Sequence, residues 1–217
     1  MTLHPIHRRR LLQSAASALG VALLGAAPWA RAADEAPEVL IKRLSDEVLD
    51  MIRADKSIQG GALKPLIAIV DNKIMPNVDF VRMTASATGP AWRRATPEQR
   101  QKLQDEFKIL LVRTYAGALK QVSDQTVEVK PMRAGPDDKE VLVRTQVTGR
   151  GDPIQLDYRL ERTPGQGAGW KIFDLNVLGV WLVTNYRSQF GEQINQNGID
   201  GLIKALAERN QANAAGK

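Results

Sequence analysis

The sequence predicts an α+β protein in which a twisted, antiparallel sheet of four strands packs against a layer of helices. Two patterns support this prediction. Apolar residues recur at helical spacing up to about residue 122 and again from residue 180, whereas between residues 123 and 177 they alternate with polar residues. Helices, then strands in close succession, then helices is the order of α+β folds with helices on one face of the sheet.

Four amino-terminal helices are predicted, over residues 37–54, 63–74, 79–87 and 97–122. Thr96, followed by Pro97 and by Gln99 three positions on, predicts a capping box at the start of the last of these. Pro76 breaks the chain after the second helix, and we expect Asp79 to form a cap or turn there. Two further helices are predicted from residues 180 and 200.

The four strands are predicted around residues 127–129, 141–147, 154–160 and 170–177. The first three alternate apolar and polar residues, as half-buried antiparallel strands do. The segment 170–177 carries apolar residues in both phases, which predicts a central strand.

Residues 1–32 predict an export signal that is cleaved. Three arginines at residues 8–10 precede an apolar run over residues 11–27, and Ala30, Arg31 and Ala32 form an A-x-A cleavage pattern. Polar residues dilute the run, whereas a membrane-spanning helix needs about 20 mostly apolar residues. We therefore expect a single domain over residues 33–217, exported by either the general or the twin-arginine route.

Loss of this signal changes the charge balance. The chain holds 30 basic and 24 acidic residues, and four of the basic residues but none of the acidic ones precede residue 33. The 26 basic and 24 acidic residues that remain give a net charge of +2 and are interleaved along the chain. This pattern does not favour a nucleic-acid partner.

The exported domain contains neither cysteine nor histidine, because the chain has no Cys and its two histidines, His4 and His7, lie in the signal. This composition excludes a thiolate nucleophile, a Ser-His-Asp triad and a zinc site built from Cys or His. We expect no metal and no cofactor. An enzyme that uses only carboxylates stays possible, with Asp174 as its candidate base, but the sequence favours a structural ion pair of Asp174 with Arg159 or Arg144.

The carboxy-terminal half resembles the MlaC family, also called toluene-tolerance proteins. The resemblance is carried by the segment from Gly169 to Leu206, which includes Trp170 to Asp174, Gly179, Asn185 to Phe190 and Gly198 to Leu202. In the amino-terminal half it is carried by Asp79, Phe80, Met83, Trp92, residues 96–99 and residues 107–119.

The resemblance implies a periplasmic carrier with an NTF2-like sheet and a helical layer. Proteins of this family carry a glycerophospholipid between an outer-membrane lipoprotein complex and an inner-membrane ABC transporter with its MCE-domain subunit, which maintains the lipid asymmetry of the outer membrane. It implies no enzymatic activity, and we expect a monomer. The alternatives are an NTF2-like enzyme that acts on an apolar substrate, and a purely structural envelope adaptor.

A curled sheet opposite apolar helices can leave a cleft for acyl chains, whose burial stabilises the complex by about 0.8 kcal/mol per methylene group. We predict that apolar side chains from both layers form its wall, and we call them the wall residues. They are Ile67, Val70, Ile74, Phe80, Leu110, Leu111, Tyr115, Val143, Leu156, Tyr158, Leu160, Leu175, Val177, Val183 and Tyr186. Ordinary core packing would give the same inward stripes.

Four basic residues lie near predicted turns, where they could meet a lipid phosphate at the mouth of the cleft. They are Lys73, Arg82, Arg93 and Arg94. A solvated surface explains them more simply, and we expect their charges to affect partner docking more than lipid loading.

Overall fold

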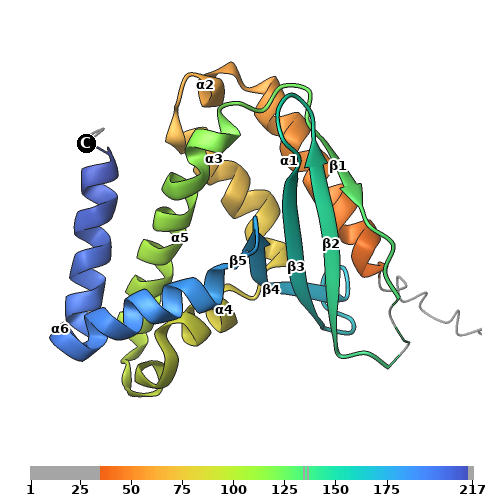
Figure 1. Ribbon diagram of the computed structural model, residues 1–217. Helices are drawn as coiled ribbons and strands as arrows, with labels where there is room; N and C mark the ends of the chain where they lie inside the picture. The colour runs from red at the N-terminus through yellow and green to blue at the C-terminus, as the bar shows by residue number, and fades with distance from the viewer. Residues whose placement is uncertain (1–34, 134, 136, 215–217) are drawn as a thin grey trace, which may run out of the picture. The chain divides into compact units, whose positions relative to one another are not determined.

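Five antiparallel strands form one sheet, in which each strand pairs with its neighbours in the sequence. Their order is β1 (Thr126–Val129), β2 (Glu140–Thr148), β3 (Ile154–Arg162), β4 (Trp170–Val177) and β5 (Val180–Trp181). The computed structural model in Figure 1 describes residues 35–133, 135 and 137–214, which all belong to one unit. The predicted export signal lies outside the described residues.

The prediction of four strands is wrong, because β5 adds a fifth at the edge of the sheet. A two-residue turn at Leu178 and Gly179, with φ of 51° and 89°, reverses the chain directly after β4. Hairpin turns of this length favour positive φ at both residues. The Asn176 side chain supports the turn by accepting a hydrogen bond from the Gly179 N–H, at 2.8 Å. The helix predicted from residue 180 therefore begins at Leu182.

The prediction of a central position for β4 is confirmed to the extent that β4 is an inner strand between β3 and β5, while β3 is the middle strand. The outer edge of β4 pairs with β5 over two residues, and Ile172 makes a single bridge to Val78. Opposite β3, Asp174 pairs with Arg159 and Ile172 pairs with Leu160, which leaves Phe173 without a partner. This β-bulge shifts the alternation of side chains along β4, which accounts for apolar residues in both phases of the strand.

The sheet has one apolar and one polar face. Residues directly opposite each other on paired strands point to the same face. Val143, Tyr158 and Leu175 are aligned in this way across β2, β3 and β4. Arg144, Asp157 and Asn176 are aligned on the opposite face.

The described residues form the helices α1 (Pro37–Ala54), α2 (Lys56–Gln59), α3 (Leu63–Ile69), α4 (Phe80–Thr88), α5 (Pro97–Leu119) and α6 (Leu182–Ala214). Shorter helical turns cover Val70–Ile74, Met75–Asn77 and Gly89–Arg94. The predicted bounds of α1 are confirmed, and so is the capping box of Thr96 and Gln99 at the start of α5. The Asp79 side chain caps α4, as predicted, by accepting a hydrogen bond from the Arg82 N–H at 2.8 Å.

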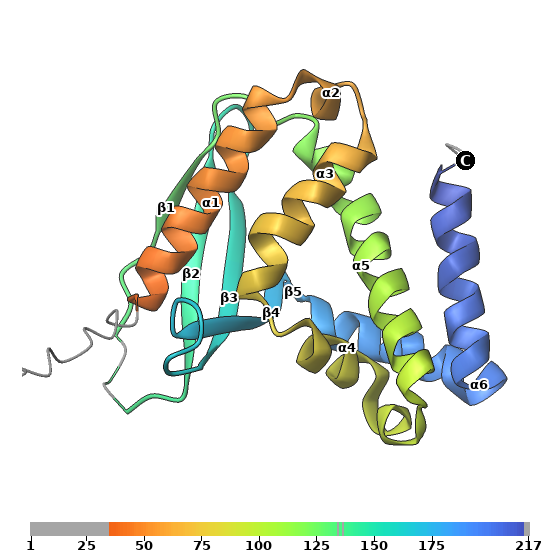
Figure 2. The same ribbon diagram turned by 180° about the vertical axis from the view of Figure 1, so that it is seen from behind.

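The helices form two groups. Helix α1 runs along β1 and β2, whereas α5 lies between α3 and the carboxy-terminal half of α6 (Figures 1 and 2). Helix α6 bends at Gly198, where φ is 70° and ψ is −173°. The bend separates two helical segments and confirms the prediction of a last helix from about residue 200.

Candidate functional site

Among the described residues, the buried apolar side chains form four clusters that share half-buried residues at their borders. The largest cluster joins α4, α5 and α6 around Phe107. A second joins α1 to the apolar face of the sheet around Val143 and Leu160. Two smaller clusters lie around Ile52 and around Leu66, the latter between α3 and α5. The cluster around Phe107 and the cluster on the sheet meet at their borders, where Val78 packs against both.

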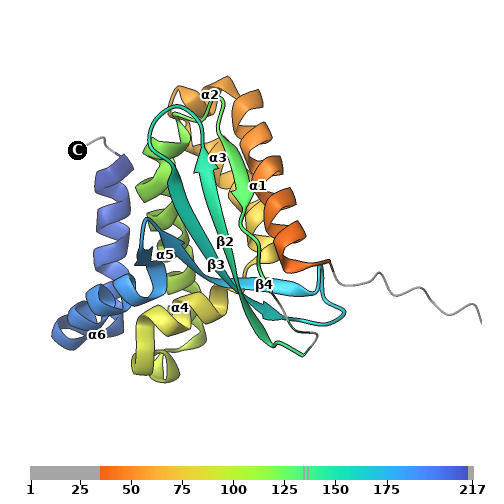
Figure 3. The ribbon, with the colours of Figure 1, turned by 45° about the vertical axis from the view of Figure 1, so that its right-hand side comes forward.

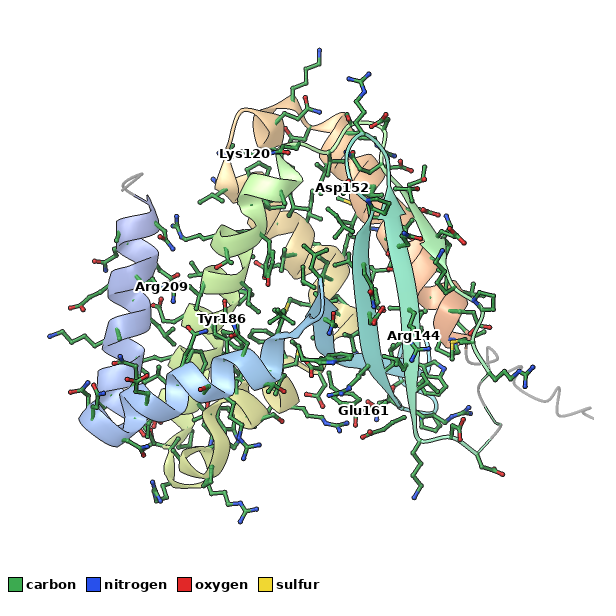
Figure 4. The ribbon with its side chains drawn as sticks, viewed as in Figure 1. Lys120, Arg144, Asp152, Glu161, Tyr186 and Arg209 are labelled. Carbon is green, nitrogen blue, oxygen red and sulfur yellow. The ribbon has the colours of Figure 1, made fainter. Side chains whose placement is uncertain are left out.

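An aromatic cluster forms the centre of the helical layer. The ring of Phe107 lies 5.6 Å from that of Phe80, 4.9 Å from that of Tyr186 and 5.1 Å from that of Phe190, measured between centroids. Figure 4 shows Tyr186 on α6 at the side that faces α5. Such contacts add about 0.5–1.5 kcal/mol per pair to the gain from burial. These four rings, which we call the aromatic cluster, fix α4 and α6 on α5.

The fifteen wall residues divide into a buried group and a half-buried group. Five are buried within the clusters: Phe80, Leu110, Val143, Leu160 and Tyr186. Ten keep part of their surface exposed, and we call them the half-buried wall residues: Ile67, Val70, Ile74, Leu111, Tyr115, Leu156, Tyr158, Leu175, Val177 and Val183.

The structure brings most of the half-buried wall residues to the edges of the clusters. The largest group packs against the cluster around Phe107. Its members come from α5, β4 and α6: Leu111, Tyr115, Leu175, Val177 and Val183. Ile67 and Val70 pack against the cluster between α3 and α5, and Tyr158 packs against the cluster on the sheet. Leu156 is aligned with Val177 on the apolar face. Ile74 belongs to none of the four described clusters.

Backbone packing gives a reason for this partial exposure. Among the described elements, α1, α4 and α6 pack closely on the sheet, and α3 and α5 pack on each other. Neither α3 nor α5 makes extensive backbone contact with any described strand. Some apolar side chains of α5 and the sheet, such as Leu111, Tyr115 and Leu175, are therefore only partly covered by protein atoms.

Sequence reasoning missed Val78, which packs against both the helical cluster and the cluster on the sheet. It also missed Met75, which packs against the helical cluster. Both residues lie close to Pro76, in a segment where apolar residues recur at neither helical nor strand spacing. The sequence pattern therefore did not indicate that they are buried against the clusters. The parallel bridge between Val78 and Ile172 could be found only from the fold.

Asp174 is buried, with 2% of its surface exposed. Its Oδ1 atom accepts hydrogen bonds from the N–H groups of Leu175 (2.9 Å) and Val183 (3.1 Å), and its Oδ2 atom lies 3.3 Å from Arg159 Nη1. The predicted ion pair with Arg159 is confirmed. Burial raises the pKa of this carboxyl, against the opposing effect of the two backbone hydrogen bonds and the nearby guanidinium.

These contacts give Asp174 a structural role at the start of α6. Its carboxylate accepts one of the free N–H groups in the first helical turn, where a negative charge is favourable. Arg159 also stacks over the ring of Trp181, with 3.9 Å from its guanidinium carbon to the ring centroid. Asp174 therefore links the sheet, β5 and α6.

Two of the four candidate headgroup ligands are already engaged with protein carboxylates. Lys73 lies 3.2 Å from Glu47, and Arg82 pairs with both Glu140 and Glu161. In the described part of the chain, neither Arg93 nor Arg94 makes an ion pair. Both are exposed, next to the start of α5.

In residues 35–133, 135 and 137–214, no three Asp or Glu side chains are grouped closely enough to hold a metal ion. Among the described helices, none is both long and apolar enough to cross a membrane.

Comparison with known proteins gives consistent matches over most of the chain. The family model "MlaC protein" matches residues 42–208. The toluene tolerance protein ttg2D of Pseudomonas putida is 29% identical over 198 residues, which cover 88% of this chain and 90% of that protein. The intermembrane phospholipid transport system binding protein MlaC of Haemophilus influenzae is 25% identical over 178 residues, covering 81% and 83%.

A solved structure is also similar. The phospholipid-binding protein of Ralstonia solanacearum, determined in complex with a phospholipid, superimposes with a TM-score of 0.77 at 46% sequence identity. The match covers 82% of this chain and 98% of that one. Since the family model spans more than half of the sequence, the chain belongs to the MlaC family.

Proposed function

We propose that this protein is a phospholipid carrier that holds acyl chains between its sheet and its helical layer. The observation that carries the proposal is the similarity to the Ralstonia solanacearum protein, whose structure contains a bound phospholipid. The half-buried wall residues support it, because they present apolar surface that neither layer covers fully. Acyl chains placed there would gain about 0.8 kcal/mol for each buried methylene group.

In this proposal the two layers of an NTF2-like fold have different tasks. The aromatic cluster and the sheet cluster hold each layer in shape. The half-buried wall residues lie at the borders of the clusters, so acyl chains can contact them without the unfolding of a core. Specificity for the acyl chains comes from shape and apolar area, since hydrophobic contact is not directional.

The proposal includes no catalytic step. Asp174, the candidate base of an NTF2-like enzyme, already accepts two backbone hydrogen bonds and faces Arg159. An acid with these contacts supports the start of α6 and has little freedom to accept a proton from a substrate.

The carrier acts in the periplasm. It consists of a single domain, residues 33–217, which remains after cleavage of the export signal. The signal pattern in residues 1–32 and the similarity to an intermembrane phospholipid transport protein support this location. There it shuttles glycerophospholipid, as a monomer, between an outer-membrane lipoprotein complex and an inner-membrane ABC transporter with an MCE-domain subunit. The small net charge of the exported domain gives no reason to expect a nucleic-acid partner.

A reconstituted transfer experiment tests the shuttle. One vesicle population carries the outer-membrane complex, a second carries the inner-membrane transporter, and a radiolabelled glycerophospholipid starts in one of them. We expect transfer to rise in proportion to added protein and to require both complexes. Transfer that is unaffected by the protein would contradict the proposal.

A further inference from the structure

We propose that four arginines around the turn between α4 and α5 form a docking site for an acidic segment of a partner protein. They are Arg93, Arg94, Arg100 and Arg187, and we call them the arginine patch. In Figures 1 and 3 this turn lies at the end of the helical layer, next to the amino-terminal half of α6. The inference goes beyond lipid carriage and does not depend on it.

Two of the arginines lie against the turn. Arg100 Nε donates a hydrogen bond to the Trp92 carbonyl oxygen at 3.2 Å, and the guanidinium carbon of Arg100 lies 5.4 Å from the Trp92 ring centroid. A Cβ atom at Gly89 would lie 3.7 Å from Arg187 Nε, which places the Arg187 side chain beside the backbone of the turn. The fold therefore brings arginines from the turn, α5 and α6 to one place.

Three members of the arginine patch are exposed, namely Arg93, Arg94 and Arg187. A guanidinium group carries its N–H donors in a planar fork, which binds a carboxylate through two parallel hydrogen bonds. The patch therefore presents several such forks to the solvent, in a turn that Arg100 holds in shape.

The charge of the arginine patch is not balanced by ion pairs. None of the ion pairs formed within residues 35–133, 135 and 137–214 includes any of its four members. Two carboxylates belong to neighbouring positions: Glu98 in the first turn of α5, and Asp200, which accepts a hydrogen bond from Gln99 Nε2 at 2.8 Å. Four guanidinium groups against two carboxylates leave an excess of positive charge, to which the amino-terminal end of α5 adds.

This excess charge selects an acidic protein segment as the occupant. Elsewhere in the described structure, Arg43 and Arg82 each pair with two carboxylates of the same chain. A partner segment with several Asp or Glu side chains would supply the carboxylates that the arginine patch lacks, and such complementarity speeds docking and makes it specific. Arginine is also enriched at protein–protein interfaces.

The surroundings of the patch disfavour an anionic bilayer as the occupant. Among the described residues, no exposed large apolar side chain lies in the turn or on α5, and Trp92 packs against the helical cluster. Proteins that lie on a bilayer insert apolar side chains into it. Binding by charge alone takes clusters of about four to eight basic residues, whereas only three members of the patch are exposed.

The test titrates the purified exported protein with an acetylated hexaglutamate peptide and follows the backbone amides and the arginine Nε–H groups by NMR. We expect a Kd of about 1 mM or lower at low salt, with the largest shifts at Arg93, Arg94 and Arg187. We also expect binding to weaken as salt is added.

A matched pair of variants locates the site. Arg93→Glu combined with Arg94→Glu should weaken peptide binding by about tenfold or more. Arg133→Glu combined with Arg209→Glu makes the same change in net charge at two exposed arginines outside the patch. This control should weaken binding by less than about twofold at 0.1 M salt, where charges more than about 10 Å apart are screened.

Three outcomes would overturn the proposal. The first is the absence of shifts at the arginine patch at peptide concentrations up to about 10 mM. The second is an equal loss of binding in the two double variants, since net charge alone would then explain it. The third is binding to phosphatidylglycerol vesicles that depends on Arg93 and Arg94 and that the peptide does not displace, because the patch would then face a bilayer.

Discussion

Helix α5 contributes to two regions that differ in how completely they are packed. Phe107 and Leu110 are fully buried in the helical cluster, whereas Leu111 and Tyr115 of the same helix stay half-buried at its border. The first region holds helices together through direct contact between rings. The second presents apolar surface that a ligand can cover. Neighbouring apolar positions on one helix can therefore serve stability or binding, according to what lies opposite.

The largest effect on stability is expected in the aromatic cluster. Phe107→Ala would leave a cavity among the rings of Phe80, Tyr186 and Phe190, and should lower the free energy of unfolding by about 3–5 kcal/mol. Leu111→Ala, the matched change in the half-buried region, should cost about 1 kcal/mol, because less buried area is lost. Urea unfolding of both variants measures the difference. Equal losses would contradict the division of α5 into two regions.

The next largest effect is expected on lipid binding, and it falls on the half-buried residues instead of the buried ones. Leu111→Trp and Val177→Trp place bulk among the half-buried wall residues and should each lower the lipid content of purified protein by about tenfold. The melting temperature should change little, since these positions are not closely packed. Val39→Trp, at an exposed position on α1, is the control. Unchanged lipid content in both wall variants would remove these residues from the proposed site.

Asp174 should show a smaller effect with a characteristic pH dependence. Asp174→Asn weakens the hydrogen bonds at the start of α6 and should cost about 1 kcal/mol at neutral pH. Burial raises the pKa of Asp174 above its ordinary value of 3.8, so the folded state binds its proton more tightly than the unfolded state. The stabilising contribution of this group is therefore fully present below pH 3.8 and is lost as the pH rises through the folded pKa.

The pH dependence is read from the difference in unfolding free energy between the wild type and Asp174→Asn. This difference should shift in favour of the wild type as the pH is lowered towards 3.8, because the variant lacks the titrating group. A difference that stays constant with pH, or that shifts in favour of the variant at low pH, would show that burial does not dominate the pKa shift of Asp174.

The smallest effect is expected at Arg93 and Arg94. Both are exposed, and neither belongs to an ion pair in the described part of the chain. The double change Arg93→Glu and Arg94→Glu should leave stability within about 0.5 kcal/mol of the wild type and leave lipid loading unchanged. Native mass spectrometry and urea unfolding measure the two quantities. A loss of loading as large as that of Leu111→Trp would place these arginines at the lipid.

The elements with local signals were predictable from the sequence. The amphipathic period of residues 37–54 fixed both ends of α1, and Thr96 with Gln99 fixed the start of α5. The strand β5 was not predictable, because it depends on the turn at Leu178 and on the contact between Asp174 and the start of α6. Neither feature has a period in the sequence.

The division of the wall residues into buried and half-buried groups could not be predicted either. An inward-facing stripe has the same pattern whether another layer covers it or not. Leu110 and Leu111 are adjacent and identical in type, yet one is buried and the other half-buried. The helices that pack on α5 decide between them, because Leu110 is buried in the cluster with α4 and α6, whereas Leu111 lies at the border of that cluster.

The most direct measurement of lipid carriage is native mass spectrometry of the exported protein from a detergent-free periplasmic extract, followed by organic extraction of any bound molecule. The account predicts a stoichiometric glycerophospholipid on the wild type and on Val39→Trp, and its loss from Leu111→Trp at an unchanged melting temperature. A wild-type protein that shows only its polypeptide mass, even after incubation with phospholipid vesicles, would contradict it.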